Sequence, residues 1–289
     1  MTEPRRDKSS GDDIGAVHSS RLATLRLLGC LGWTLVMLPI QAALLAVGAI
    51  AWSRRNARWY WRGIATILSL RLIVRGAPAE RRPILYVSNH SSYLDIVALG
   101  AVVDAAFIAK SEVRSWPGFG LIARLGRTVF VDRRPRKSAV HRDDMLARLA
   151  KSGESLILFP EATSHDGNRV RPFKSALFSA AEVKDATGRA LVVQPVTVAY
   201  TQLDGMPMGR AWRPLYTWFG DMALAGHLWT MIGLGSTTVE VELHPATSMD
   251  AFPSRKELAD YCFRSVSAGL ASANAGRILL PLDPRAKPA

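Results

Sequence analysis

A stretch of 26 uncharged residues, Leu27–Trp52, constrains this chain more than any other feature. A transmembrane helix needs about 20 consecutive apolar residues, so this stretch is long enough to span a bilayer core. It is longer than the apolar region of a secretory signal peptide, and its charged lead-in is longer than usual. A helix buried in a soluble core is the alternative. We expect residues 27–75 to form membrane-embedded and interfacial helices.

The flanks of this stretch do not fix its topology. Basic side chains both precede and follow it, so the positive-inside rule gives no orientation. Pro39 lies at its middle and favours a kink. A bent, re-entrant helix pair with both ends on the cytoplasmic face and a straight span therefore both stay open. The flanking basic residues are Arg5, Arg6, Lys8, Arg21 and Arg26 before it, and Arg54, Arg55, Arg58 and Arg62 after it.

The segment from Trp52 to Arg62 interleaves aromatic residues with arginine. Aromatic rings favour the boundary of a bilayer, and guanidinium groups meet lipid phosphate there. Apolar positions continue at helical spacing through Leu72, which predicts an interfacial helix, with a helix packed on the core as the alternative. We expect residues 1–26 to form a disordered basic tail and residues 276–289 a C-terminal tail.

The charge balance points to an anionic partner. The chain has 289 residues, a formal net charge of +13 and a pI of about 10.3. Nucleic acid is disfavoured, because no zinc-ligand set, helix-turn-helix pattern or ribonucleoprotein-type aromatic motif is present. Basic residues instead flank apolar segments, which favours a membrane surface. The two cysteines, Cys30 and Cys262, predict neither a disulfide framework nor a metal site.

From residue 76 onward, short apolar runs alternate with helical patterns. This alternation predicts an α/β domain over residues 76–275, with a mostly parallel mixed sheet flanked by helices. Residues 203–236 look like an insertion. The expected strands are Ile84–Val87, Ala105–Ala109, Thr128–Val131, Ser155–Phe159, Leu191–Tyr200 and Val239–Leu243; the expected helices are Tyr93–Val103, Gly118–Leu125, Ser138–Lys151, Lys174–Val183 and Ser254–Ala273.

A histidine and a carboxylate follow the first of these strands at a spacing of five residues, as His90 and Asp95. A helix starting between them would bring Asp95 back toward His90, and a carboxylate on one imidazole nitrogen leaves the other as a base. No serine or cysteine lies in an obvious nucleophile elbow, so a substrate hydroxyl could serve as the nucleophile and the chain would be a transferase. A surface histidine beside a capping aspartate is the alternative.

Further charged residues follow the other strands, at the edge of the sheet where sites gather. Arg133 could clamp an anion with two hydrogen bonds, and Glu161 follows Phe159-Pro160 directly. Lys174 is another candidate anion contact. Solvated loop charges are the alternative for each. Pro195 interrupts a strand, which suggests an edge position or a strand end near the site.

In order and spacing, four blocks together resemble the glycerolipid acyltransferase family, of the bacterial lysophosphatidic acid acyltransferase type. Ala162 stands where the family usually has glycine, and Ser175-Ala176 replaces a common Lys-Gly pair. Less diagnostic segments, Phe107–Pro117 and Trp218–Met222, resemble the lyso-ornithine lipid acyltransferase branch. The four blocks are Asn89, His90 and Asp95; Gly126 through Arg133; Phe159, Pro160, Glu161 and Thr163; and the strand around Pro195.

This resemblance implies a membrane-bound O-acyltransferase that moves a fatty acyl group from a thioester to a lysolipid hydroxyl. The first expected acceptor is 1-acyl-sn-glycerol-3-phosphate, and the alternative is lyso-ornithine lipid. The donor would be acyl-CoA or acyl-carrier protein, with no metal or bound cofactor. The resemblance also places the protein in the bacterial inner membrane, with its catalytic domain on the cytoplasmic face and membrane lipids around it.

The resemblance also assigns roles to residues. His90 would take the hydroxyl proton and Asp95 would orient its ring. Arg133 would bind an anionic headgroup and Glu161 a hydroxyl of the acceptor. The remaining expected substrate contacts are Thr163, Lys174 and Asn89.

Backbone N–H groups near a helix start are the expected oxyanion donors. Two rivals stay open at this point. One is a hydrolase that uses water in place of the lipid hydroxyl. The other is a catalytically inactive membrane lipid-binding protein, which Ala162 favours.

Overall fold

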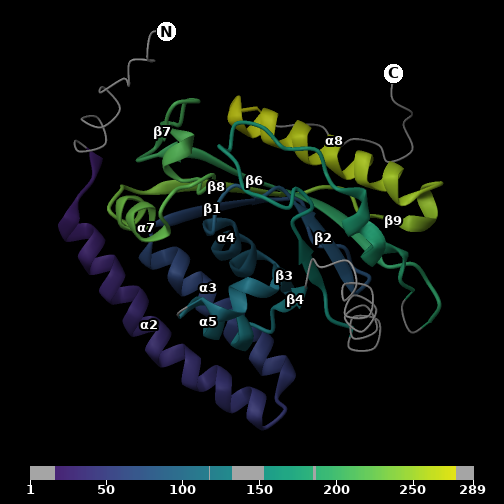
Figure 1. Cartoon of the computed structure of the whole chain (residues 1–289), viewed down its shortest axis with the longest axis horizontal. Helices are drawn as coiled ribbons and strands as arrows, with labels where there is room; N and C mark the ends of the chain where they lie inside the picture. The colour runs from purple at the N-terminus through teal and green to yellow at the C-terminus, as the bar shows by residue number, and fades with distance from the viewer. Residues whose placement is uncertain (1–16, 117, 132–152, 185–186, 278–289) are drawn as a thin grey trace.

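The structure is a computed structural model that describes residues 17–116, 118–131, 153–184 and 187–277. These residues form a nine-stranded mixed sheet with helices on both faces (Figure 1). The predicted α/β class is therefore confirmed. The expected helix at 138–151 lies outside the described residues.

The strands follow the order β1-β8-β6-β2-β5-β3-β4, with β7 and β9 also paired to β6. Strands β2 to β6 run parallel to one another, whereas β8 is antiparallel to β6. All five side chains of β2 are buried, as its uninterrupted apolar run requires of a strand covered on both faces. The strands are β1 Leu70–Arg75, β2 Ile84–Ser88, β3 Ala106–Lys110, β4 Val129–Val131, β5 Leu156–Leu158, β6 Val192–Leu203, β7 Met206–Pro207, β8 Thr237–Leu243 and β9 Thr247–Ser248.

Helices cover the two faces of the sheet unequally. Helix α8 lies along one face, while α4 and α3 lie on the other and α2 lies outside α3 (Figure 1). Ser254 caps α8 by accepting a hydrogen bond from the backbone N–H of Glu257. The α-helices are α2 Ser20–Ala46, α3 Ile50–Ile67, α4 Leu94–Val102, α5 Phe119–Leu125, α7 Leu224–Ile232 and α8 Arg255–Asn274; the 3₁₀ helices are η1 Ser111–Ser115, η2 Ser175–Glu182, η3 Arg213–Leu215 and η4 Met249–Ala251.

Helices α2 and α3 form a hairpin at the N-terminal side of the fold. Within the described residues, α2 is the one helix long and apolar enough to cross a membrane, and only 6% of its apolar window is buried. It continues through Pro39, and the chain reverses at 47–49, where Gly48 has a φ of +70°. The reversal therefore lies at a glycine that tolerates positive φ, whereas Pro39, which favours a kink, lies inside the helix.

Two boundaries differ from the sequence predictions. Helix α2 begins at Ser20, so residues 20–26 are helical and do not belong to the expected tail. Residues 70–75 form strand β1, although Leu72 was expected to continue the interfacial helix. The strand forms because it pairs in parallel with β8, a partner that lies more than 160 residues away in the sequence.

We expected Pro195 at an edge position or at a strand end near the site; the edge position is wrong, because β6 lies inside the sheet. On one side β6 pairs with β2 from Val192 to Val196. On the other side its antiparallel partner changes from β9, at Val192 and Val193, to β8, at Val196. Pro195 occupies the junction between these two partners, where a missing backbone donor disrupts no regular ladder.

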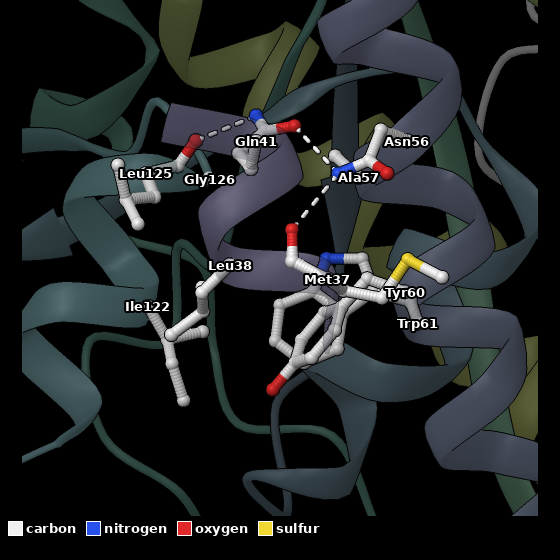
Figure 2. Close-up of a pocket in the computed structure, with 10 residues that line it drawn as sticks. All are labelled: Met37, Leu38, Gln41, Asn56, Ala57, Tyr60, Trp61, Ile122, Leu125 and Gly126. Carbon is white, nitrogen blue, oxygen red and sulfur yellow. Dashed lines mark hydrogen bonds between the residues drawn. The ribbon is translucent and has the colours of Figure 1, made fainter. Parts of the chain in front are cut away.

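A buried polar network joins α2, α3 and α5 (Figure 2). The Gln41 amide nitrogen donates to the Ser53 hydroxyl at 2.9 Å and to the Leu125 carbonyl at 2.8 Å. The Asn56 amide nitrogen donates to the Gln41 side-chain oxygen at 2.9 Å and lies 3.4 Å from the Met37 carbonyl. Because Gln41 and Asn56 are buried among apolar side chains, these bonds fix the register of the hairpin.

We expect Gln41→Leu to lower the free energy of unfolding by about 1–3 kcal/mol, because it leaves buried polar partners unsatisfied. Thermal unfolding of the purified protein in detergent measures the change. Ala42→Leu adds the same side chain at an exposed neighbouring position and serves as the matched control. Equal unfolding temperatures for the two variants would show that the network does not stabilise the hairpin.

Candidate active site

The loop that follows β2 is tied to β6 by Asn89. The Asn89 amide nitrogen donates to the carbonyl of Val198 at 2.9 Å, and its oxygen accepts the Val198 N–H at 2.8 Å. The side chain is fully buried. We expected Asn89 to contact substrate, but both of its polar atoms are committed to the sheet. Its role in the structure is to fix the start of the loop.

Asp95 lies in the first turn of α4, and its carboxylate is fully buried. Oδ2 accepts the backbone N–H groups of Ser91 and Ser92 at 2.7 and 2.9 Å, and lies 2.9 Å from Nδ1 of His90. Oδ1 accepts the Tyr200 hydroxyl at 2.7 Å. Burial and the adjacent carboxylate raise the pKa of Tyr200 well above its ordinary value, so its phenol stays protonated and donates.

The His90 ring is held with one nitrogen inward. Its Nδ1 faces Asp95, and the ring stacks on Phe159 with centroids 4.2 Å apart. A quarter of the side chain is exposed. Because Asp95 fixes Nδ1 as the donor, Nε2 keeps its lone pair and can act as a base. In the described part of the chain, no serine or cysteine side chain is hydrogen-bonded to this ring.

Glu161 holds the backbone of this loop from the other side. Its Oε1 accepts the N–H of His90 at 2.7 Å, and its Oε2 accepts the N–H of Arg171 at 2.6 Å. The side chain is only 2% exposed. Nε2 of His165 lies 2.8 Å from Oε2, while Nδ1 of His165 accepts the N–H of Gly167. Glu161 was expected to bind an acceptor hydroxyl, but here both of its oxygens contact protein groups.

Of the other predicted substrate contacts, Thr163 and Lys174 lie in the described part of the chain. Thr163 and Lys174 are exposed, and the Lys174 N–H donates to the carbonyl of Pro160 at 3.0 Å, which places it beside the third block. Lys174 precedes the 3₁₀ helix η2, where we expected an α-helix. Arg133 lies outside the described residues. The substrate-binding roles of these three residues stay predictions.

The backbone donors next to His90 are already used. The N–H of His90 bonds to Glu161, and the N–H groups of Ser91 and Ser92 bond to Asp95. These N–H groups lie just before α4, where we expected the oxyanion donors. These three groups are therefore not free donors in the structure, and the identity of the oxyanion donors stays a prediction.

The segment at 203–236, expected as an insertion, borders the catalytic loop. The N–H of Trp218 donates to the carbonyl of Ser91 at 2.9 Å, and its ring packs edge-on against Trp116. The Tyr93 hydroxyl lies 3.0 Å from Nδ1 of His227, which α7 carries. The two segments that resembled the lyso-ornithine branch therefore meet beside the loop that carries His90.

Three structural partners of the site were missed in the sequence. Tyr200 and Val198 lie on β6, more than 100 residues from the groups they bind, and nothing near them signals this role. His165 stands four residues after Glu161, a spacing that could have suggested contact.

Ala162 has a φ of +65°, in the left-handed region that favours glycine. It directly follows Glu161, so the departure from the family pattern falls on a strained residue of the site.

We expect Ala162→Gly to raise the free energy of unfolding by about 0.5–1 kcal/mol, because glycine removes the cost of positive φ. Thermal unfolding measures the change in stability. Ala123→Gly inside α5 is the control, and it should lower the free energy of unfolding by about 1 kcal/mol. Destabilisation of the same size in both variants would contradict the strain at residue 162.

We expect Tyr200→Phe to lower kcat about tenfold with little change in KM, because it removes one donor to a buried charged group. Tyr216→Phe is the matched control: Tyr216 stacks on Tyr200 but does not contact Asp95. Steady-state kinetics with a thioester donor and a lysolipid measure both variants. An equal kcat in the two variants would remove the role assigned to Tyr200.

Comparisons with known proteins agree with this geometry. The family model described as "Acyltransferase" matches residues 71–199. A lyso-ornithine lipid O-acyltransferase of Brucella abortus is 43% identical over 84% of this chain and 92% of its own length. A 1-acyl-sn-glycerol-3-phosphate acyltransferase of Neisseria meningitidis is 32% identical over 73% of this chain and 78% of its own. The crystal structure of PlsC from Thermotoga maritima shares the fold, with a TM-score of 0.58, 20% identity and coverage of 85% and 95%.

Proposed function

This chain belongs to the acyltransferase family, and on that premise we propose that it acylates the free hydroxyl of lyso-ornithine lipid. The observation that carries the chemistry is the 2.9 Å contact between Nδ1 of His90 and the buried Asp95, which leaves Nε2 on a partly exposed ring. The nucleophile is then the acceptor oxygen, since no side-chain nucleophile among the described residues contacts that ring.

The reaction proceeds by direct transfer between the two substrates. Nε2 of His90 takes the hydroxyl proton as the acceptor oxygen forms a bond to the thioester carbonyl carbon. Asp95 stabilises the imidazolium that results. The tetrahedral intermediate then collapses, the carbon–sulfur bond breaks, and His90 returns the proton to the leaving thiolate. The products are an ester and a free thiol, and the enzyme is unchanged.

Two acceptors are candidates, and the relatives rank them. The lyso-ornithine lipid O-acyltransferases of Brucella abortus and Rhizobium meliloti are 43% and 39% identical over 84% and 78% of this chain. The 1-acyl-sn-glycerol-3-phosphate acyltransferase of Neisseria meningitidis is 32% identical over 73%. This ranking reverses the order of the sequence predictions. The acceptor 1-acyl-sn-glycerol-3-phosphate stays the second candidate, because relatives named 1-acyl-sn-glycerol-3-phosphate acyltransferase still match most of the chain. Arg133 could pair with the carboxylate of one headgroup or the phosphate of the other.

The donor we propose is acyl-CoA or acyl-carrier protein, without a metal or bound cofactor. The exposed apolar surface of α2 supports attachment to a membrane. We place the protein at the bacterial inner membrane with its sheet domain on the cytoplasmic side, where soluble acyl thioesters are available.

The test is an acceptor panel with the purified full-length protein in detergent. A labelled acyl thioester is incubated with lyso-ornithine lipid, with 1-acyl-sn-glycerol-3-phosphate, or without acceptor, and the products are identified by mass. We expect product with lyso-ornithine lipid at the highest kcat/KM. His90→Ala should lower the rate by about 10²–10⁴-fold in a protein that still folds.

His18→Ala is the matched control, because His18 packs on Trp229 and does not contact the site residues. Near-wild-type transfer by folded His90→Ala would remove His90 as the base. Thioester consumption at full rate without a lysolipid would instead indicate a hydrolase. Lipid binding without any thioester turnover would indicate an inactive binding protein.

A further inference from the structure

A charged recess lies under α3, at the edge of the sheet opposite the one that carries His90. Its volume is about 350 Å³ including its open mouth. Three of its residues, Asp104, Arg127 and Glu154, lie two residues before the starts of β3, β4 and β5. His90 instead follows the carboxyl end of β2. Because these strands are parallel, the recess and the candidate active site occupy opposite edges.

Arginine dominates the charge of this recess. Arg127 pairs with Glu154 at 2.6 Å, and Arg58 lies 3.7 Å from Asp104. Arg82 lies 3.6 Å from the same Asp104 carboxylate. Arg54 also lines the recess, and within the described residues it forms no ion pair. Three guanidinium groups and two carboxylates thus line the recess, and with Arg82, which pairs with Asp104 from outside this lining, the cluster carries two more positive than negative charges.

Three of these guanidinium groups carry buried N–H donors that nothing accepts. Nε of Arg54, Nε of Arg58 and one terminal nitrogen of Arg127 have no hydrogen-bond partner within the described chain. Unsatisfied buried donors are rare in native proteins, because each loses its water without gaining a partner. Several guanidinium donors around one recess match the acceptor oxygens of a phosphate group.

The backbone at Arg127 supports the same conclusion. Arg127 follows Gly126, the C-cap of α5, and has a φ of +62°. Glycine is the usual residue at this position of a helix C-terminus, because other residues pay for positive φ. An arginine held there despite that cost indicates a requirement for its side chain, which lines the recess.

We propose that this recess binds a phosphate group, at a site separate from the acyl-transfer centre. The headgroup of a membrane phospholipid and free phosphate share this chemistry. The position of α3 favours the headgroup. Trp52 and Trp59 are each 59% exposed on this helix, and the Arg55 guanidinium lies 5.0 Å from the Trp52 ring centroid. Such side chains favour the headgroup zone of a bilayer, so the recess lies beside a surface suited to that zone.

The test compares two adjacent arginines on one helix in the full-length protein. Arg54→Gln removes a guanidinium that lines the recess, and Arg55→Gln removes the same charge from an exposed position. Inorganic phosphate is titrated against the unfolding temperature in detergent. Separately, sedimentation measures binding to phosphatidylcholine vesicles with and without phosphatidylglycerol. The difference between the variants cancels the non-specific attraction of a basic protein to anionic vesicles.

We expect Arg54→Gln to weaken binding about tenfold relative to Arg55→Gln, as for loss of a hydrogen bond to a charged group. A difference between the two variants that is confined to phosphatidylglycerol vesicles identifies a lipid headgroup as the ligand. A difference in the phosphate titration identifies free phosphate. Should Arg54→Gln fail to fold, Arg54→Lys keeps the charge but loses the guanidinium geometry and is expected to weaken binding less. Equal behaviour of the residue 54 and residue 55 variants in both assays would overturn the site and leave an ion-pair cluster only.

Discussion

The site depends on the carboxylate of Asp95, a buried charge that is stable only because it is fully hydrogen-bonded. Two backbone N–H groups, the His90 ring and the Tyr200 hydroxyl surround its two oxygens. A charge in such a position costs several kcal/mol unless it is paired. The same bonds that stabilise the carboxylate orient the imidazole, so the requirement to satisfy a buried charge also leaves Nε2 of His90 available as the base that we propose.

The surrounding residues hold the loop that carries this pair. Asn89 joins the loop to β6, and Glu161 accepts the backbone N–H of His90 from the end of β5. The loop is thus attached to three neighbouring strands, at the carboxyl edge where sites of parallel sheets form. Helix α2 lies outside α3 and exposes most of its apolar surface, which suits association with a membrane. A rigidly held imidazole in a domain that also carries an exposed apolar helix suits a lipid acceptor.

Local sequence patterns predicted the class of fold and the His90–Asp95 contact. The buried runs of β2 and β5 signal their strands by composition, and the spacing of the pair places both residues at one helix start. Contacts that depend on distant partners were missed. Asn89 and Glu161 look like substrate contacts in sequence, but their partners lie 109, 71 and 10 residues away. Strand β1 forms only because β8 pairs with it, and Gln41 is inconspicuous in an apolar stretch until Asn56 faces it.

The central claim is that the nucleophile belongs to the acceptor and that His90 only moves its proton. Intact-protein mass spectrometry tests this most directly, after incubation of the enzyme with an acyl thioester and no lysolipid. We expect the protein mass to stay unchanged, because no side chain is acylated during direct transfer. A mass increase of one acyl chain that disappears when lysolipid is added would contradict direct transfer and require a covalent acyl-enzyme.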